Sequence, residues 1–248
     1  MMSVGSSSTC IWPSWTCFSS SPKPFKFPLL YSQFSCNNSH NPSYSSADQV
    51  LTDIQDSGII ACLRAPSAEA AVQAARAALR GGISVLEVVM STPGVFEVGT
   101  VLNKQDARDA IRAGAKFLMS PAMVKDILDD VAQGEALYIP GVMTPTEILS
   151  ASNSGAKIVK VYPVSALGGV GYIAAVRKPF PFIPMVASQG IATDSVGEYI
   201  SEGASSVVLS DAIFDKKAMS QKNFDVIYRR AGLAASQGSM AVKRKTKG

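Results

Sequence analysis

Histidine, tryptophan and cysteine are nearly absent from most of this chain. His40, the only histidine, lies in the first 47 residues together with both tryptophans and three of the four cysteines. From residue 48 onward the single cysteine is Cys62. These absences exclude a Ser–His or Cys–His nucleophile pair and intrachain disulfides there, and they leave no His and Cys ligand set for a metal such as zinc. Chemistry in this part of the chain must therefore use Lys, Arg, Asp, Glu, Tyr, Ser or Thr.

Long apolar runs and a strong net charge are also lacking. No stretch approaches the roughly 20 apolar residues that a membrane-spanning helix needs. A formal net charge of +4 on 248 residues is too weak to indicate a nucleic-acid partner. We therefore expect neither a membrane nor nucleic acid among the partners. The polar segment 236–248, with Lys243, Arg244, Lys245 and Lys247, is expected to be a basic flexible tail.

Acidic residues are missing from residues 1–47, a Ser-rich segment whose only cations are Lys23 and Lys26. Its prolines interrupt any helix, so it cannot bury a core. An acid-free, Ser-rich N-terminus is typical of an organelle transit peptide. Because the segment has no Arg, we favour the chloroplast (plastid) stroma over the mitochondrion; a merely disordered N-terminal extension is the alternative.

From residue 48 to 235, short apolar runs alternate with Ala-rich and charged stretches of helical spacing. Strands alternating with helices indicate βαβ units and a parallel sheet that is covered on both faces. With roughly eight such units and no G-x-G-x-x-G or P-loop motif, the pattern favours one α/β domain with a TIM (β/α)8 barrel fold over an open doubly wound sheet. The runs are Ile59–Leu63, Val85–Met90, Phe117–Met119, Leu137–Ile139, Ile158–Tyr162, Phe182–Ala187 and Ser206–Leu209.

One connection, near residues 91–99, is too short for this pattern. The run that ends at Met90 is soon followed by residues 98–103, which are typical of a strand end entering a helix. A crossover with its helix needs at least about 10–12 residues. The sequence therefore predicts that one helix and most of a strand are missing, and an incomplete barrel with unpaired edges is the alternative to a closed one.

Three charged residues, Arg64, Glu87 and Lys160, lie in or at the end of apolar runs. Side chains alternate between the two faces of a strand, and in a barrel one face meets the helices while the other points inward. Burying an unpaired charge costs several kcal/mol, so we expect the three to converge in the interior. A buried Arg–Glu–Lys cluster that only stabilises the barrel is the alternative interpretation.

These residue types together suit Schiff-base chemistry. A desolvated lysine near another cation has a lowered pKa, and its neutral amine can attack a ketone to give an imine, an electron sink for carbon–carbon cleavage. A nearby carboxylate can move the protons, and an arginine can bind the carboxylate of an oxo acid. The pattern indicates a small-molecule 2-oxo acid as substrate, with Lys160, Glu87 and Arg64 in these roles.

Several segments between about Ser57 and Phe214 resemble, in the same order, the bacterial-type 2-keto-3-deoxy-6-phosphogluconate (KDPG) and 4-hydroxy-2-oxoglutarate (KHG) aldolases. With its transit-like N-terminus, the chain is identified as a plant plastid-type member. The resemblance implies a barrel that is commonly a homotrimer and needs no metal or other cofactor. The matching segments are Ile59–Arg64, Gly81–Val88, Gly99–Asn103, Met119–Pro121, Tyr138–Glu147 and Lys160–Pro163.

The resemblance also implies an activity and roles. The activity is class I cleavage of a 2-keto-3-deoxy sugar acid or 4-hydroxy-2-oxo acid to pyruvate, or a glyoxylate-type partner, plus an aldehyde. Lys160 is then the Schiff-base lysine and Glu87 the general acid/base. The residues expected at the substrate are Arg64, Thr100 on the pyruvyl carboxylate, Pro121 at the mouth, Tyr162 beside the imine, and Ser188, Gly190 and Asp211 in two turns where the family binds phosphate.

The chain departs from the family at Ser91, where many members have a carboxylate-binding arginine, and in both phosphate turns. The turns here are Ser188–Gly190 and Ser210-Asp211, instead of Thr-Gly-Gly and Gly-Ser. A carboxylate at Asp211 repels a phosphate dianion, so we expect an unphosphorylated substrate such as 4-hydroxy-2-oxoglutarate or 2-keto-3-deoxygluconate. The alternative is that Asp211 only caps the next helix and phosphate still binds.

Two other functions stay open. A non-catalytic or inactive degenerate aldolase-like barrel is favoured by the short connection and opposed by the Lys160–Glu87 pair. A different phosphate-binding barrel enzyme, such as an isomerase or a thiamine-phosphate synthase, does not need a lysine in the middle of this strand. Cys62, on the same face of its strand as Arg64, is interpreted as a small buried thiol.

Overall fold

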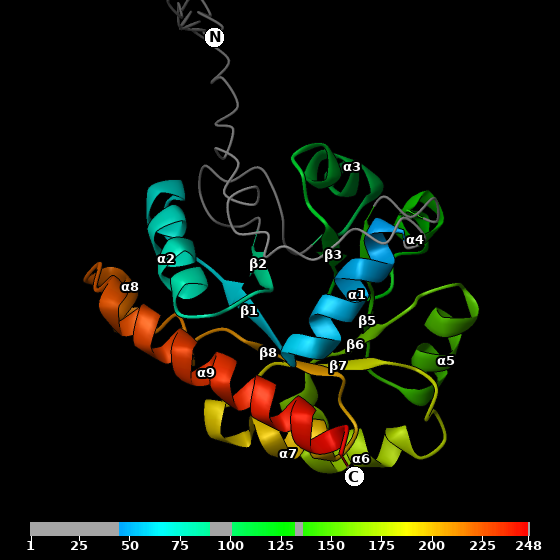
Figure 1. The fold of residues 1–248 in the computed structure, drawn as a ribbon. Coiled ribbons are helices and arrows are strands. Elements are labelled where there is room, and N and C mark those ends of the chain that lie inside the picture. Colours follow the sequence, from blue (N-terminus) through cyan, green and yellow to red (C-terminus); the bar gives the residue numbers. More distant parts are fainter. Residues whose placement is uncertain (1–44, 90–100, 132–135, 248) are drawn as a thin grey trace, which may run out of the picture.

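Parallel strands curl into a barrel-like sheet with helices on its outside (Figure 1). The structure is a computed structural model that describes residues 45–89, 101–131 and 136–247. Thr100, the short connection near residues 91–99 and nearly all of the segment expected to be a transit peptide lie outside the described residues. Within them, the prediction of an α/β fold built on a parallel sheet is confirmed.

The strands form two groups. One sheet has the order β2-β1-β8-β7-β6-β5, and β3 pairs with β4. Each of these ladders is parallel. Only Pro140 separates β4 from β5, so the two groups are continuous along the chain. The strands are β1 (Ile59–Leu63), β2 (Leu86–Val88), β3 (Phe117–Met119), β4 (Leu137–Ile139), β5 (Gly141–Val142), β6 (Val159–Val161), β7 (Met185–Ser188) and β8 (Ser206–Leu209).

β2 and β3 lie at the two ends of this arrangement. Among the described residues no ladder joins them. The N–H of Val101 donates a hydrogen bond to the carbonyl of Met119 at 3.0 Å, so the chain that leads into the next helix lies beside β3. The described part of the sheet is therefore a curled, open barrel.

Most helices begin at a residue whose side chain caps the first turn. In α5, Thr144 accepts from the N–H of Glu147 at 3.3 Å, and Glu147 accepts in return from the N–H of Thr144 at 2.7 Å. The α-helices are α1 (Ser46–Ser57), α2 (Ala68–Arg80), α3 (Lys104–Arg112), α4 (Lys125–Val131), α5 (Pro145–Asn153), α6 (Val170–Arg177), α7 (Val196–Ser201), α8 (Lys216–Ser220) and α9 (Phe224–Lys245). Two 3-10 helices are η1 (Val164–Leu167) and η2 (Thr193–Ser195).

Alternate residues of each strand face two separate apolar cores. In β1, Ile60 and Cys62 face the barrel interior, whereas Ile59, Ala61 and Leu63 face the surrounding helices. Both faces of the strand are therefore buried, which is why its sequence is a continuous apolar run.

α1 closes the amino-terminal end of the sheet. Its Val50 and Ile54 belong to the interior core together with strand residues such as Phe117 and Leu137. Figure 1 shows α1 lying across the sheet rather than along its outside. The carboxyl ends of the strands, where barrel enzymes carry their active sites, therefore lie at the end of the sheet opposite α1.

The C-terminal segment differs from its prediction. Residues 236–245 are not a flexible tail but the last turns of α9, with Gly238 and Ala241 buried. A Cβ on Gly238 would lie 2.5 Å from the carbonyl oxygen of Ser57, so this face of α9 packs directly on the end of α1. The prediction rested on the basic residues of this segment. The contact with α1 depends instead on small residues at helical spacing, Gly238 and Ala241. At the other end of the described chain, α1 begins at Ser46.

We expect Ile54→Ala to lower the free energy of unfolding by about 2–5 kcal/mol, because it leaves a cavity beneath the barrel interior. Ile54 is fully buried. Urea unfolding followed by circular dichroism would measure the change. Asp56→Ala, at an exposed position of the same helix, is the control and should change stability by less than about 0.5 kcal/mol. Equal effects of the two substitutions would show that α1 does not close the barrel.

Candidate active site

β2 and β6 place Glu87 and Lys160 on the inner face of the sheet. Val85 and Val89, two residues to either side of Glu87, belong to the interior core, as does Ile158, two residues before Lys160. Only 3% of the surface of Glu87 and 6% of that of Lys160 is exposed. Glu87 and Lys160 are therefore both buried on the inner face of the sheet, as expected from the sequence.

The Lys160 amine has a lowered pKa. Its removal from water is the main cause, because burial disfavours the charged ammonium, and the nearby Arg64 guanidinium acts in the same direction. The Glu87 carboxylate opposes them by favouring the protonated form. The amine nitrogen lies 5.3 Å from the centroid of the Tyr162 ring. Lys160 therefore combines a buried position with a larger share of the neutral, nucleophilic amine than an ordinary lysine.

Cys62 is a direct neighbour of Glu87. The register of the β1–β2 ladder pairs the two residues, and both side chains face the interior. Burial raises the pKa of the Cys62 thiol far above its ordinary value, and the adjacent Glu87 carboxylate raises it further. The thiol therefore lies beside Glu87 in its neutral form. A small buried thiol could be predicted from the sequence, but its contact with Glu87 could not, because that contact depends on the register between two strands.

Arg64 lies one residue beyond the end of β1 and is exposed. The expectation that it would be buried with the other two charges is therefore wrong, since the strand ends before it. Its guanidinium still contributes to the electrostatic environment of Cys62 and Lys160. Arg64 is accordingly placed at the rim of the site and not in its interior.

The turn after β7 contains two residues in the left-handed backbone region, Gln189 with a φ of 88° and Gly190 with a φ of 74°. A Cβ on Gly190 would lie 2.6 Å from Cβ of Ser165, so this turn and the segment after β6 approach each other where only glycine fits. Ser165 donates a hydrogen bond to the Gln189 side chain. Ser188, the last residue of β7, is buried. Ser188 and Gly190, the two residues of this turn that were expected at the substrate, thus lie at the carboxyl edge of the sheet.

Asp211 follows β8 and is exposed, with its carboxylate 3.4 Å from the amine of Lys216. The helix that comes next, α8, is capped by Asp215, whose side chain accepts from the N–H of Ala218 at 2.8 Å. The alternative in which Asp211 caps that helix is therefore wrong. Pro121 follows β3 at the same edge of the sheet, and its backbone lies against Gly141, the partner of Lys160 in the β5–β6 ladder.

No group of three His, Cys, Asp or Glu side chains is placed to hold a metal ion in the part of the chain that the structure describes. In the same residues no helix is long and apolar enough to cross a membrane.

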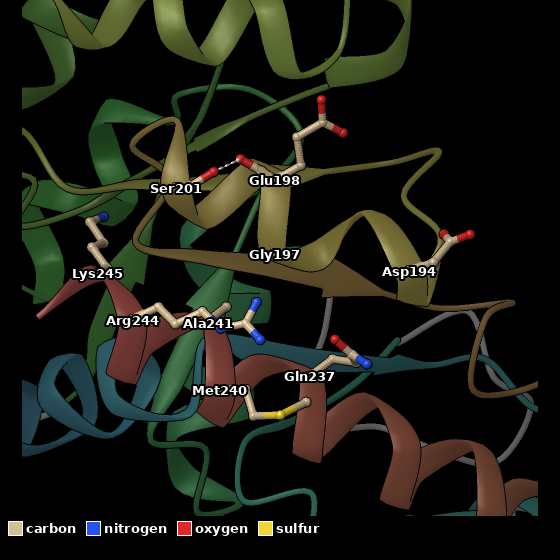
Figure 2. Close-up of a pocket in the computed structure, with 9 residues that line it drawn as sticks. All are labelled: Asp194, Gly197, Glu198, Ser201, Gln237, Met240, Ala241, Arg244 and Lys245. Carbon is tan, nitrogen blue, oxygen red and sulfur yellow. Dashed lines mark hydrogen bonds between the residues drawn. The ribbon is translucent and has the colours of Figure 1, made fainter. Parts of the chain in front are cut away.

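A separate pocket of about 570 Å³ lies between α7 and α9. Figure 2 shows that its walls carry charges of both signs, among them Glu198 on α7 and Arg244 on α9. None of the residues expected at the active site lines it. Its lining residues come from η2, α7 and α9, and none of them lies on a strand.

A buried amine and a buried carboxylate lie on the inner face of a parallel sheet that α1 closes at its amino end, in a (β/α) barrel fold whose members carry their active sites at the carboxyl ends of the strands. The family model of KDPG and KHG aldolase matches residues 50–230. The chain belongs to this family.

Known relatives agree in sequence and in fold. The 2-dehydro-3-deoxy-phosphogluconate aldolase of Pseudoalteromonas atlantica is 34% identical over 146 residues, which are 53% of this chain and 68% of that protein. The KHG/KDPG aldolase of Escherichia coli is 28% identical over 63% of this chain and 79% of its own length. A KDPG aldolase structure from Legionella pneumophila superimposes with a TM-score of 0.69 at 25% identity, covering 73% and 96% of the two chains. That structure holds pyruvate captured as a covalent carbinolamine intermediate.

We expect the Cys62 thiol to resist alkylation in the folded protein, since burial and the neighbouring Glu87 keep it protonated. Iodoacetamide at pH 8, followed by peptide mass spectrometry, should leave the Cys62 peptide unmodified in the native protein and modify it fully in urea. Rapid modification of the native protein would show that the inner face of β1 is open to solvent.

Proposed function

We propose that this chain is a class I aldolase in which Lys160 forms a Schiff base with a 2-oxo acid. The observation that carries the proposal is a buried lysine amine of lowered pKa on the inner face of the sheet, within electrostatic reach of the Glu87 carboxylate. The substrates we infer are a 2-keto-3-deoxy sugar acid or a 4-hydroxy-2-oxo acid, cleaved to pyruvate plus an aldehyde, which is glyoxylate when the substrate is 4-hydroxy-2-oxoglutarate. The covalent pyruvate adduct of the Legionella relative supports the same chemistry.

The steps follow from the groups present. The neutral amine of Lys160 adds to the C2 ketone, and loss of water from the carbinolamine gives an iminium. The iminium accepts the electron pair of the C3–C4 bond as it breaks, which releases the aldehyde and leaves an enamine. Protonation at C3 and hydrolysis then release pyruvate and restore the amine. Glu87 moves the protons in these steps, and Arg64 at the rim pairs with the substrate carboxylate.

The turn after β8 supports an unphosphorylated substrate. The Asp211 carboxylate is paired with Lys216 at 3.4 Å, but the two side chains are 69% and 87% exposed. An ion pair this exposed is weak, so the carboxylate still opposes an incoming dianion. We infer that 4-hydroxy-2-oxoglutarate or 2-keto-3-deoxygluconate is preferred over the phosphorylated sugar acid.

The proposal extends to the setting of the enzyme. The acid-free, Ser-rich residues 1–47 support import into the plastid stroma as a plant plastid-type member of the family. The short chain between Val88 and Lys104 and the open β2 and β3 edges support a family member that lacks one helix and most of a strand. A homotrimer is the assembly that we infer from the family.

The open edges also favour a second candidate function. Among the described residues no ladder joins β2 to β3, and strand edges that stay unpaired lower stability. An inactive aldolase-like barrel, kept for binding or assembly, would have the same edges. The two candidates differ in whether the Lys160 amine reacts.

We expect borohydride reduction in the presence of pyruvate to leave a pyruvyl group on Lys160 and none in Lys160→Ala. Peptide mass spectrometry would locate the adduct. Lys157→Ala is the matched control: this lysine lies only three residues away but is half-exposed and paired with Asp48 at 2.6 Å, so its loss should leave the adduct unchanged. A cooperatively melting protein that forms no adduct would support the inactive barrel instead.

We expect Asp211→Asn to raise kcat/KM for 2-keto-3-deoxy-6-phosphogluconate about tenfold relative to 4-hydroxy-2-oxoglutarate. Removing one carboxylate charge near a dianion is worth on the order of 1 kcal/mol at the protein surface. Asp225→Asn, an exposed position on α9, is the control and should leave the ratio unchanged. An unchanged ratio in Asp211→Asn as well would show that this carboxylate does not select against phosphate.

A further inference from the structure

The Pro121 turn, residues 120–124 after β3, lies directly on strand β5. A Cβ on Gly141 would be 2.2 Å from the carbonyl carbon and oxygen of Pro121 and 2.6 Å from the N of Ala122, so only glycine admits this approach. Gly141 pairs with Lys160 in the β5–β6 ladder. The turn is therefore one strand away from the residue proposed to form the Schiff base, at the same level of the sheet.

A chain of hydrogen bonds holds this turn from below. The N–H of Val124 donates to the Tyr138 hydroxyl at 3.1 Å, and the hydroxyls of Tyr138 and Ser120 are 2.6 Å apart. Ser120 donates to the carbonyl of Ala122 at 2.5 Å, and the Tyr138 hydroxyl lies 3.5 Å from the same carbonyl. Both ends of the turn are thus tied to one tyrosine on the neighbouring strand β4.

Both hydroxyls are withdrawn from water. Ser120 is fully buried and Tyr138 is 2% exposed, with its ring in the outer core between the sheet and the helices. Burial raises the pKa of the Tyr138 hydroxyl above its ordinary value, so it stays protonated and can donate. Loss of a hydrogen-bond partner costs more free energy for a buried hydroxyl than for an exposed one. The turn is therefore strongly restricted to the conformation that keeps these hydrogen bonds.

We propose that Tyr138 and Ser120 are positioning residues that hold the Pro121 turn over the mouth of the Lys160 site and so set the affinity for the 2-oxo acid. The inference rests on the proposed aldolase function. Neither residue reaches Lys160; they act through the backbone of the turn. Loss of the Tyr138 hydroxyl should therefore affect substrate binding more than the reactivity of the lysine.

The test is Tyr138→Phe, which keeps the buried ring and removes only the hydroxyl. With 4-hydroxy-2-oxoglutarate we expect KM to rise about fivefold and kcat to change less than twofold. The reason is that the turn loses the equivalent of about one hydrogen bond that holds it in place. The borohydride-trapped pyruvyl adduct at saturating pyruvate should be unchanged. Ser120→Ala should raise KM in the same way, whereas Tyr228→Phe, which removes the hydroxyl of a half-exposed tyrosine on α9, should not.

Hydrogen–deuterium exchange tests the positioning without relying on activity. In Tyr138→Phe the amides of residues 120–124 should exchange at least severalfold faster, while those of β6 are unchanged. Unchanged exchange, or a KM equal to that of the wild type, would overturn the proposal. If the wild type forms no pyruvyl adduct and cleaves nothing, the aldolase function fails, and with it the role in substrate affinity. The exchange data would then still decide whether the two hydroxyls hold the turn.

Discussion

The burial of one amine, that of Lys160, is the constraint on which this structure depends. A charged amine in an apolar interior is costly unless it is paired or gives up its proton. In this sheet, apolar and titratable side chains lie at different ends of the interior. Apolar side chains and α1 fill the amino end, while the Lys160 amine, the Glu87 carboxylate and the Cys62 thiol share the inner face nearer the other end. The buried titratable side chains of the interior are therefore gathered nearer the carboxyl ends of the strands.

Within that end, the influences on the amine are opposed. Burial and Arg64 lower the pKa of Lys160, and Glu87 raises it. A base that pairs too strongly with the amine would keep it protonated and unreactive. Cys62, the ladder partner of Glu87, acts on the amine in the same direction as the carboxylate and raises the pKa of Lys160. Arg64, at the exposed rim, lowers the pKa of the amine without being buried beside it.

The sequence predicted what depends on residue type along a single strand. Lysine and glutamate inside apolar runs could only face the interior, and that placement is confirmed for Lys160 and Glu87. Prediction from the sequence failed where the position of a residue depends on contact with another segment. The Arg64 strand ends one residue too early for burial, and α9 continues past residue 236 because Gly238 meets the end of α1. The hydrogen bonds of the Tyr138 hydroxyl could not be predicted from the sequence, because its partners lie in the turn that follows a different strand, β3.

The open edge between β2 and β3 bears on stability more than on the reactive pair. Glu87 and Lys160 are joined by an unbroken series of ladders from β2 through β1, β8 and β7 to β6. Their separation is therefore fixed by backbone hydrogen bonds that do not involve β3. The β3 side is instead tied to the site by Pro140 and by the Ser120–Tyr138 contact beneath the Pro121 turn. Fraying of the β3 edge would first loosen the mouth of the site, while the amine and the carboxylate kept their geometry.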